Sequence, residues 1–271
     1  MIIILGSRGM LGRDLVECLR KTNYIYCDYG KDEINITSKY NLDKLNSDTS
    51  IIINCAAYTN VDMAEKEKDK CYKVNVEGTN NLVEFCKLRN IVFVYISTDY
   101  VFDGKKKSYN EMDKKNPINY YGETKSQGED IVMNGLKKYY IIRTSWTFGK
   151  YGKNFINKIV QLCNDNLEIK VVKDQVGSPT YTKDLSYKIL EIVNEQYPYG
   201  IYHITNSGIC SRCDLAKEVV RIKKYDCNIL SCKSLDFLTG AKRPSYSTLN
   251  NNKTTLLRIW EKALREYLLK D

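Results

Sequence analysis

Short apolar runs alternate with longer amphipathic stretches through the first half of the chain. Each apolar run has the length of a buried strand, and each amphipathic stretch has the spacing of a helix with one apolar face. Strands are predicted at residues 2–5, 25–27, 51–54, 91–96 and 140–143, and helices at 10–20, 62–88 and 120–132. Because consecutive parallel strands need helical crossovers, this alternation predicts an α/β fold with a doubly wound parallel sheet.

The pattern is less regular after residue 146, where shorter elements follow one another. Helices are predicted at 154–163, 182–194, from about 211 and at 254–269, and strands at 167–172 and 201–204. We expect one sheet domain formed by residues 1–146 with about 179–197. Residues 147–178 and 198–271 then form a smaller C-terminal α/β lobe.

The composition is that of an ordinary globular protein. Of the 271 residues, 43% are hydrophobic and 28% are charged, which argues against a disordered chain, a collagen-like chain or a coiled-coil rod. The 42 Lys and Arg against 33 Asp and Glu give a net charge of +9. The basic residues are scattered, so they suit a solvated surface or an anionic ligand such as a nucleotide, and we expect no nucleic-acid partner.

The cysteines and the first residues suggest where the protein works. Five apolar residues are followed at once by Gly6, without the basic segment and long apolar run of a signal peptide. No stretch approaches the roughly 18 apolar residues that a membrane helix needs. Ten cysteines in this setting are expected to be free thiols. We therefore expect a cytoplasmic protein with no membrane partner.

A glycine-rich segment lies between the first predicted strand and the first predicted helix. Its sequence is Gly6-Ser7-Arg8-Gly9-Met10-Leu11-Gly12. Glycines three residues apart permit a tight turn, a close approach of the backbone to a pyrophosphate, and close packing of the helix on the strand. The N–H groups and the dipole at the helix N-terminus favour that anion. The segment therefore predicts a dinucleotide site, which makes the sheet domain a Rossmann domain.

Two charged residues bear on the choice of dinucleotide. Asp28 ends the second predicted strand, where an acid usually accepts hydrogen bonds from the adenosine ribose and favours NAD. Arg8 in the glycine segment favours a 2′-phosphate, so NADH and NADPH both stay open. Cys55, Ala56 and Ala57 follow the third strand, where small side chains suit either a cofactor close to the backbone or plain packing.

A possible catalytic group combines residues from two segments. Tyr121 and Lys125 are four residues apart on a predicted helix and share one face. A nearby ammonium is expected to lower the pKa of the phenol, which suits acid–base chemistry. Ser97, Thr98 and Asp99 follow the fourth strand, at the edge of the sheet where ligands bind. Together with the glycine segment, these residues predict a hydride-transfer site.

At this point the chain resembles a known family, the extended short-chain dehydrogenase/reductases. The resemblance rests on the glycine segment, on Tyr121-x-x-x-Lys125, and on stretches that run in family order from residue 1 to about 260. These stretches are Asn54-Cys55-Ala56-Ala57-Tyr58-Thr59-Asn60-Val61-Asp62, Ser97-Thr98-Asp99-Tyr100-Val101-Phe102, Arg143-Thr144-Ser145-Trp146, Asp174-Gln175-Val176-Gly177-Ser178-Pro179-Thr180 and Arg243-Pro244-x-x-Ser247. The match covers nearly the whole chain and implies that the smaller lobe binds the substrate.

The resemblance also implies roles for individual residues. Thr98, Tyr121 and Lys125 would be catalytic, and Thr98, Asp99, Trp146 and Arg243 would bind the substrate. The implied cofactor residues are Gly6, Arg8, Gly9, Met10, Leu11, Gly12, Asp28, Asn35, Ile36, Cys55, Ala56, Ala57, Tyr121 and Lys125. Arg243 would hold a nucleotide diphosphate, which suits a bidentate guanidinium. Trp146 could equally belong to the core, but its position just past the fifth strand favours contact with the sugar.

The reaction that the resemblance implies is the reduction of a nucleotide-linked keto sugar. An NADPH- or NADH-dependent enzyme would reduce the C4 ketone of dTDP-4-dehydro-β-L-rhamnose to dTDP-β-L-rhamnose, in the last step of dTDP-L-rhamnose biosynthesis. One alternative is a reductase of a UDP- or CDP-linked 4-keto-6-deoxy sugar, with or without epimerase activity. The other alternative is a non-catalytic regulatory protein like the β subunit of methionine adenosyltransferase. The presence of the complete set of Thr98, Tyr121 and Lys125 argues against this alternative.

The resemblance leaves the assembly open between a monomer and a homodimer. Some members of the family carry Mg²⁺ at a dimer contact made by glutamates. Asp14 stands at one of these positions here, and the other ligands have no evident counterpart. We therefore expect no metal at this position.

The other candidate metal ligands are cysteines, and the single histidine is a candidate only for catalysis. Cys210, Cys213, Cys227 and Cys232 could be read as zinc ligands. However, Ser211 and Asp214 have the spacing of a helix cap, which would place Cys213 in the first helical turn. We therefore expect these cysteines to be buried free thiols. His203 lies in a predicted strand and is expected to be structural.

Overall fold

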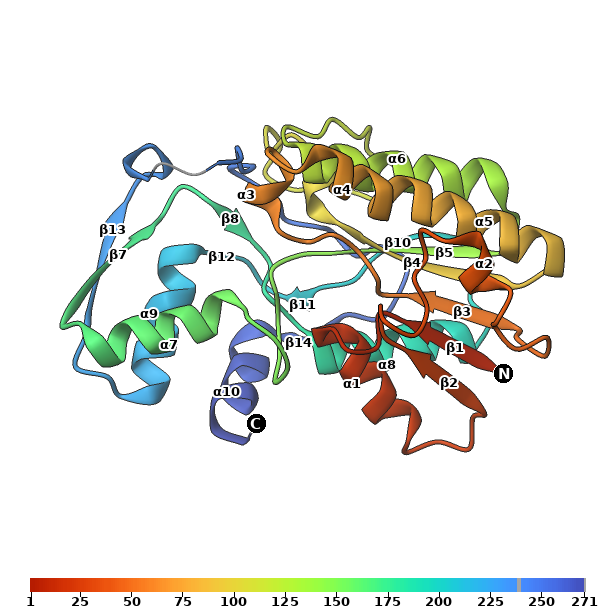
Figure 1. Ribbon diagram of the computed structural model, residues 1–271. Coiled ribbons are helices and arrows are strands. Elements are labelled where there is room, and N and C mark those ends of the chain that lie inside the picture. Colours follow the sequence, from red (N-terminus) through yellow and green to blue (C-terminus); the bar gives the residue numbers. More distant parts are fainter. Residues whose placement is uncertain (238–239, 271) are drawn as a thin grey trace.

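The computed structural model describes residues 1–237 and 240–270, and its largest element is a parallel sheet (Figure 1). Six strands follow the order β10-β5-β4-β3-β1-β2. They are β1 (Ile2–Leu5), β2 (Tyr26–Tyr29), β3 (Ile51–Asn54), β4 (Val92–Thr98), β5 (Tyr139–Thr144) and β10 (Gly200–His203). Because the chain winds in one direction from β1 to β2 and in the other from β3 to β10, the predicted doubly wound parallel sheet is confirmed.

Helices cover both faces of the sheet, since alternate residues of a strand point to opposite faces. The helices are α1 (Met10–Leu19) and α8 (Thr182–Asn194) on one face, and α5 (Gly78–Arg89) and α6 (Tyr120–Gly135) on the other. Ile4 of β1 packs in the core beneath α1 and α8, whereas Ile3 packs in the core beneath α5 and α6. Figure 1 shows the second pair above the sheet and the first pair below it.

The prediction of one long helix over residues 62–88 is wrong. The segment divides into α3 (Val61–Ala64), α4 (Lys68–Tyr72), a π-helical turn at Lys73–Glu77, and α5. Tertiary hydrogen bonds account for the irregular turn, because the Asn75 amide bonds to both backbone groups of Tyr58 and donates to Thr124 Oγ1 of α6. Turns of this kind often occur at functional sites.

A second hydrophobic core is formed by elements outside the large sheet. Its elements are α7 (Phe155–Asp165), β7 (Glu168–Val172), α9 (Arg212–Lys223), β13 (Asn228–Cys232) and α10 (Trp260–Lys270). Strands β7 and β13 pair in parallel, and α7 and α9 pack together beside them (Figure 1). Aromatic side chains fill this core, with the rings of Phe148 and Tyr181 stacked 5.4 Å apart between centroids.

Short strands and turns connect the two cores. They are β6 (Thr147–Phe148) with β9 (Thr180–Tyr181), β8 (Val176–Gly177) with β12 (Cys210–Ser211), and β11 (Asn206–Ser207) with β14 (Leu257–Ile259). The remaining elements are α2 (Lys39–Leu42) and two 3₁₀ turns at Asp99–Val101 and Ser234–Asp236. The predicted helix 254–269 is therefore wrong at its beginning, because β14 pairs with β11 and the helix begins only at Trp260.

The division of the chain into a sheet domain and a smaller lobe stays a prediction. One strand lies across the expected boundary, since β10 belongs to the segment 198–271 but forms an edge of the large sheet. Within residues 1–237 and 240–270, no helix is long and apolar enough to cross a membrane.

Candidate active site

Two adjoining cavities lie at the carboxyl ends of the parallel strands. The larger, about 530 Å³, is lined by residues that end or follow β3, β4 and β5. The smaller, about 300 Å³, lies against the glycine segment and the residues after β2. Gly9, Cys55 and Ala57 line both, so the cavities meet beside the start of α1. This is the edge at which doubly wound sheets bind their ligands.

The glycine segment has the geometry that its sequence predicts. Gly6 has φ +74°, and a Cβ there would lie 2.6 Å from the backbone nitrogen of Ala56. A Cβ on Gly12 would lie 2.4 Å from the carbonyl oxygen of Gly6, so only glycine allows α1 to pack this closely. Helix α1 has no side-chain cap at Gly9, which leaves its N-terminal N–H groups for an anion at the cavity wall.

Several of the predicted cofactor residues line the smaller cavity, but the acid expected at the adenosine ribose does not. Gly6, Arg8, Asn35, Ile36 and Ala56 line it, whereas Asp28 does not.

Asp28 is instead bound by Arg8. The Asp28 carboxylate accepts a hydrogen bond from Arg8 Nη1 at 3.0 Å. Arg8 Nη2 donates to Glu33 Oε2, also at 3.0 Å, and sequence reasoning did not single out this second acid. The two residues expected to favour different dinucleotides therefore neutralise each other.

The predicted catalytic residues meet in the larger cavity. Thr98 ends β4, and Tyr121 and Lys125 lie on α6, whose first turn is fixed by the Asn119 side chain accepting from Gly122 N at 2.8 Å. The Thr98 hydroxyl donates to Asp99 Oδ1 at 3.0 Å, and its proximity to the Tyr121 phenol lowers the pKa of that phenol. Met10 and Leu11 line the same cavity from the cofactor loop.

Burial controls the ionisation of these groups. It raises the pKa of Tyr121 well above its ordinary value, with a further contribution from the Asp99 carboxylate. The prediction that Lys125 lowers this pKa is wrong, because the cost of removing a phenolate from water exceeds the ammonium's effect. Burial also lowers the pKa of Lys125 to about 7, an effect that Glu129 partly offsets. Burial raises the pKa of Asp99 to about 6, although hydrogen bonding to Ser247 and Thr98 lowers it.

Lys125 is only 2% exposed, yet the described residues give its ammonium no carboxylate within 4 Å. Its Nζ lies over the ring of Tyr95, 3.9 Å from the centroid. Lys125 lines the cavity, and its ammonium has three N–H donors with which it could bind ribose hydroxyls.

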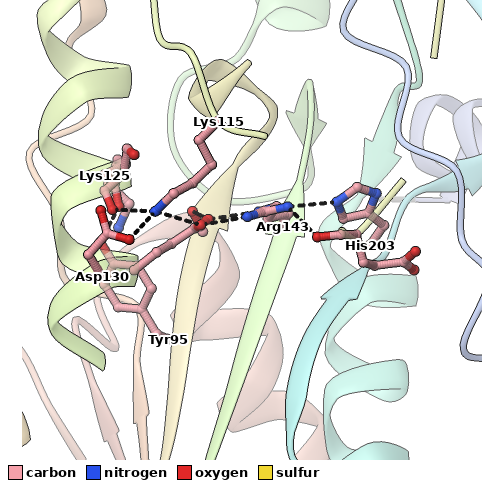
Figure 2. Close-up of polar contacts among 10 residues, drawn as sticks. Tyr95, Lys115, Lys125, Asp130, Arg143 and His203 are labelled. Atoms are coloured by element: carbon pink, nitrogen blue, oxygen red, sulfur yellow. Dashed lines mark hydrogen bonds and ion pairs between the residues drawn. The ribbon is translucent and has the colours of Figure 1, made fainter. Parts of the chain in front are cut away.

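A buried polar network lies behind the catalytic helix and ties it to the sheet (Figure 2). Glu129 of α6 accepts from Arg143 of β5 at 2.9 and 2.7 Å and from Ser97 of β4 at 2.5 Å. Arg143 also approaches His203 of β10, whose other ring nitrogen lies 3.1 Å from the Asn250 carbonyl. Burial lowers the pKa of His203, so the imidazole is neutral and has the structural role expected for it.

On the substrate side of the cavity, Trp146 and Asp99 line the wall as expected, but Arg243 does not. Arg243 is held by the Asp62 carboxylate, with contacts of 2.7 and 3.0 Å. Trp146 adopts φ +48°, a strained conformation for a bulky residue and one that often marks a functional site. Sequence reasoning missed Arg212, which lines the cavity with its guanidinium carbon 3.6 Å from the centroid of the Trp146 ring.

The candidate metal ligands have other partners. Asp14 is buried and accepts a hydrogen bond from Thr182. All ten cysteines are free, and the predicted cap is confirmed, since Ser211 and Asp214 form a capping box with Cys213 in the first turn of α9. In the part of the chain that the structure describes, no three His, Cys, Asp or Glu side chains are grouped to hold a metal ion.

Known proteins resemble this chain over its whole length. Residues 1–271 match the family described as RmlD substrate binding domain. The spore coat polysaccharide biosynthesis protein SpsK of Bacillus subtilis is 36% identical, over 98% of this chain and 96% of its own. A dTDP-4-dehydrorhamnose reductase of Aggregatibacter actinomycetemcomitans is 37% identical, over 97% of each chain. The crystal structure of dTDP-4-dehydrorhamnose reductase from Bacillus anthracis in complex with NADP has a TM-score of 0.96 and 37% identity, covering 100% of this chain and 99% of that one.

Proposed function

The chain belongs to the RmlD substrate binding domain family, and from this premise we propose that it is a dTDP-4-dehydrorhamnose reductase. It reduces the C4 ketone of dTDP-4-dehydro-β-L-rhamnose to dTDP-β-L-rhamnose with a nicotinamide cofactor. The observation that carries the proposal is one cavity in which the glycine segment, Thr98, Tyr121, Lys125 and Trp146 meet. A protein that only bound a nucleotide would not need the acid–base group.

The residues present fit a dinucleotide. The close approaches at Gly6 and Gly12 leave the backbone open to a pyrophosphate, and the uncapped start of α1 supplies N–H donors for it. The nicotinamide, when bound, supplies the hydride. Lys125 holds the nicotinamide ribose through its ammonium, and Asn35 and Ile36 border the adenosine.

Tyr121 is the proton donor in this mechanism. Its raised pKa keeps the phenol protonated at neutral pH, as an acid that gives a proton to the ketone oxygen must be. Thr98 lines the cavity with Tyr121, and its hydroxyl, which donates to Asp99 in this structure, rotates to donate to the same ketone oxygen, where negative charge develops. Because the cavity wall is largely buried, both donors act with little competition from water.

Substrate recognition falls to the residues opposite the glycine segment. Asp99 and Trp146 contact the deoxyhexose, and Arg243, positioned by Asp62, serves the nucleotide diphosphate. In this proposal residues 1–146 with about 179–197 bind the cofactor, and 147–178 with 198–271 bind the substrate. The free thiols support a reducing, cytoplasmic setting, for a monomer or a homodimer.

Both NADH and NADPH serve as reductants in this proposal. Arg8 offsets the charge of Asp28, so neither a 2′-hydroxyl nor a 2′-phosphate meets an uncompensated carboxylate. The relative from Bacillus anthracis was crystallised with NADP, which supports the phosphorylated form as one of the two.

The test compares cofactor oxidation with dTDP-, UDP- and GDP-linked 4-keto-6-deoxy sugars side by side. We expect the highest kcat/KM with the dTDP-linked sugar and measurable rates with both NADH and NADPH. Faster turnover of a UDP-linked sugar would assign another substrate to the site. A complete lack of turnover, with cofactor bound, would favour a regulatory role.

A further inference from the structure

The larger cavity is lined by an arginine, Arg212, that has no role in the proposed mechanism. Arg212 lines this cavity and is the first residue of α9, a helix that Figure 1 shows well apart from α6. Its guanidinium lies over the ring of Trp146, and also 4.9 Å from the ring centroid of Phe155. The capping box of Ser211 and the hydrogen bond from Arg212 N to the Gln175 carbonyl fix its backbone.

The charge of Arg212 is not balanced by an acid. Arg243 forms an ion pair with Asp62 at 2.7 Å, but among the described residues no carboxylate lies within 4 Å of the Arg212 guanidinium. Tyr100 neighbours both cations, whose charges lower the pKa of its phenol against the larger effect of burial. Burial lowers the pKa of Arg212, an effect that Tyr100 and the Asp99 carboxylate partly offset and that Arg243 increases. Removing a cation from water costs free energy unless an anion pairs with it, so an anionic ligand at this wall would stabilise Arg212.

The geometry of the substrate places its anion at this wall. In a pyranose ring C1 lies across the ring from C4. When the C4 ketone is beside Tyr121, the diphosphate on C1 therefore points away from the catalytic group. The glycine segment lines the cavity at the start of α1, whereas Trp146 follows β5 and Arg212 begins α9, so the two cavity-lining side chains come from elements other than the cofactor loop.

We infer that Arg212 is the principal cation that binds the diphosphate of the nucleotide sugar, with Tyr100 and the Asp62-bound Arg243 beside it. The inference rests on the proposed function and adds the group that recognises the anionic half of the substrate. A planar guanidinium matches two phosphate oxygens at once, and its stack on Trp146 holds that plane while the indole faces the sugar. In this inference, the same guanidinium binds the diphosphate and holds the Trp146 ring in place.

The experiment is calorimetric titration of dTDP into the NADPH-loaded protein, with Arg212→Gln, Arg212→Lys and the control Arg221→Gln. Arg221 lies on the same helix but is exposed and paired with Glu218, so its loss should leave dTDP affinity unchanged. Arg212→Gln should weaken dTDP binding about 10- to 100-fold, because a charge-assisted hydrogen bond is lost. Arg212→Lys keeps the charge and should recover part of the loss, and NADPH affinity should stay the same throughout.

Two results would overturn the inference. One is dTDP binding by Arg212→Gln at wild-type affinity. The other is an Arg212→Lys variant that folds but binds dTDP no better than Arg212→Gln, since the residue would then act only by supporting Trp146. The proposed function fails separately, if the wild-type protein turns over no dTDP-linked 4-keto sugar while its dTDP affinity still depends on Arg212.

Discussion

Tyr121 lines the larger cavity with Thr98, and burial raises its pKa so that the phenol stays protonated. Tyr121→Phe removes this acid and keeps the ring, which packs edge-on against Tyr100 with centroids 6.1 Å apart. We predict that kcat falls about 10²- to 10⁴-fold, equivalent to about 3–5 kcal/mol in the barrier. The dissociation constant for NADPH should barely change, because the phosphate and adenosine contacts lie elsewhere.

Tyr120→Phe is the matched control for that variant. The Tyr120 ring faces Lys68, at 5.1 Å from its centroid, and takes no part in lining the cavity. Turnover should therefore be close to normal. Near-normal turnover by Tyr121→Phe, or a larger loss in Tyr120→Phe, would show that the proton donor has been assigned to the wrong residue.

Lys125 predicts a pH dependence of cofactor binding. Its pKa in the free protein is about 7, and a ligand that prefers the charged ammonium raises that value. Above pH 7 binding must then take up a proton, so NADPH affinity should fall by as much as tenfold per pH unit, and below pH 7 this dependence should disappear. Calorimetry at pH 8 in buffers of different ionisation enthalpy measures the proton directly. Proton uptake that persists unchanged in Lys125→Met would refute this assignment.

The contacts of Arg8 predict how the cofactor preference can be changed. Asp28 and Glu33 hold the guanidinium from two sides, and Arg8 itself is largely exposed. Asp28→Ala removes a negative charge near the ribose and frees Arg8 for a 2′-phosphate. The NADPH:NADH ratio of kcat/KM should rise about fivefold, corresponding to the roughly 1 kcal/mol of an exposed charge pair. An unchanged ratio would place Asp28 away from the adenosine site.

At the scale of elements, the position of α6 decides whether the catalytic group forms. Glu129 binds Arg143 of β5 and Ser97 of β4, so one carboxylate joins the catalytic helix to the two strands that end at the cavity (Figure 2). Both members of the ion pair are almost completely buried. Removing one member leaves the other charge without compensation in the core.

Glu129→Gln should therefore lower the free energy of unfolding by about 3–5 kcal/mol, measured by urea denaturation. Glu123 lies on the same helix but is exposed, and Glu123→Gln should change stability by less than about 0.5 kcal/mol. Equal, small effects of the two substitutions would mean that the network does not hold α6 to the sheet.

The elements differ in how well the sequence predicts them. The sheet strands and α8 could be predicted, because continuous apolar runs and a sustained 3.6-residue period are local signals. The irregular turn around Asn75 could not, since the hydrogen bonds to Tyr58 and Thr124 come from segments 17 and 49 residues away. Strand β14 could not be predicted for the same reason, because it is formed by pairing with β11, a segment distant in the sequence.

At the scale of the whole molecule, the cavity lies where the large sheet and the smaller lobe meet. Thr98 and Tyr121 could be predicted, because a strand end and a helical spacing give their positions. Arg212 and Glu33 could not, because their roles depend on tertiary packing that brings them to Trp146 and to Arg8. Likewise, the Asp62–Arg243 ion pair joins residues 181 positions apart.

In the proposed reaction, this cavity transfers a hydride from the cofactor to C4 of a dTDP-linked sugar, and an isotope label on that hydride follows the step. The protein is incubated with dTDP-4-dehydro-β-L-rhamnose and NADPH carrying deuterium at the transferring position of nicotinamide C4. NMR and mass spectrometry of the product then locate the label. We expect dTDP-β-L-rhamnose with one deuterium at C4 for each NADPH oxidised. An unreduced sugar in the presence of bound cofactor, or a label at any other carbon, would contradict the proposed reaction.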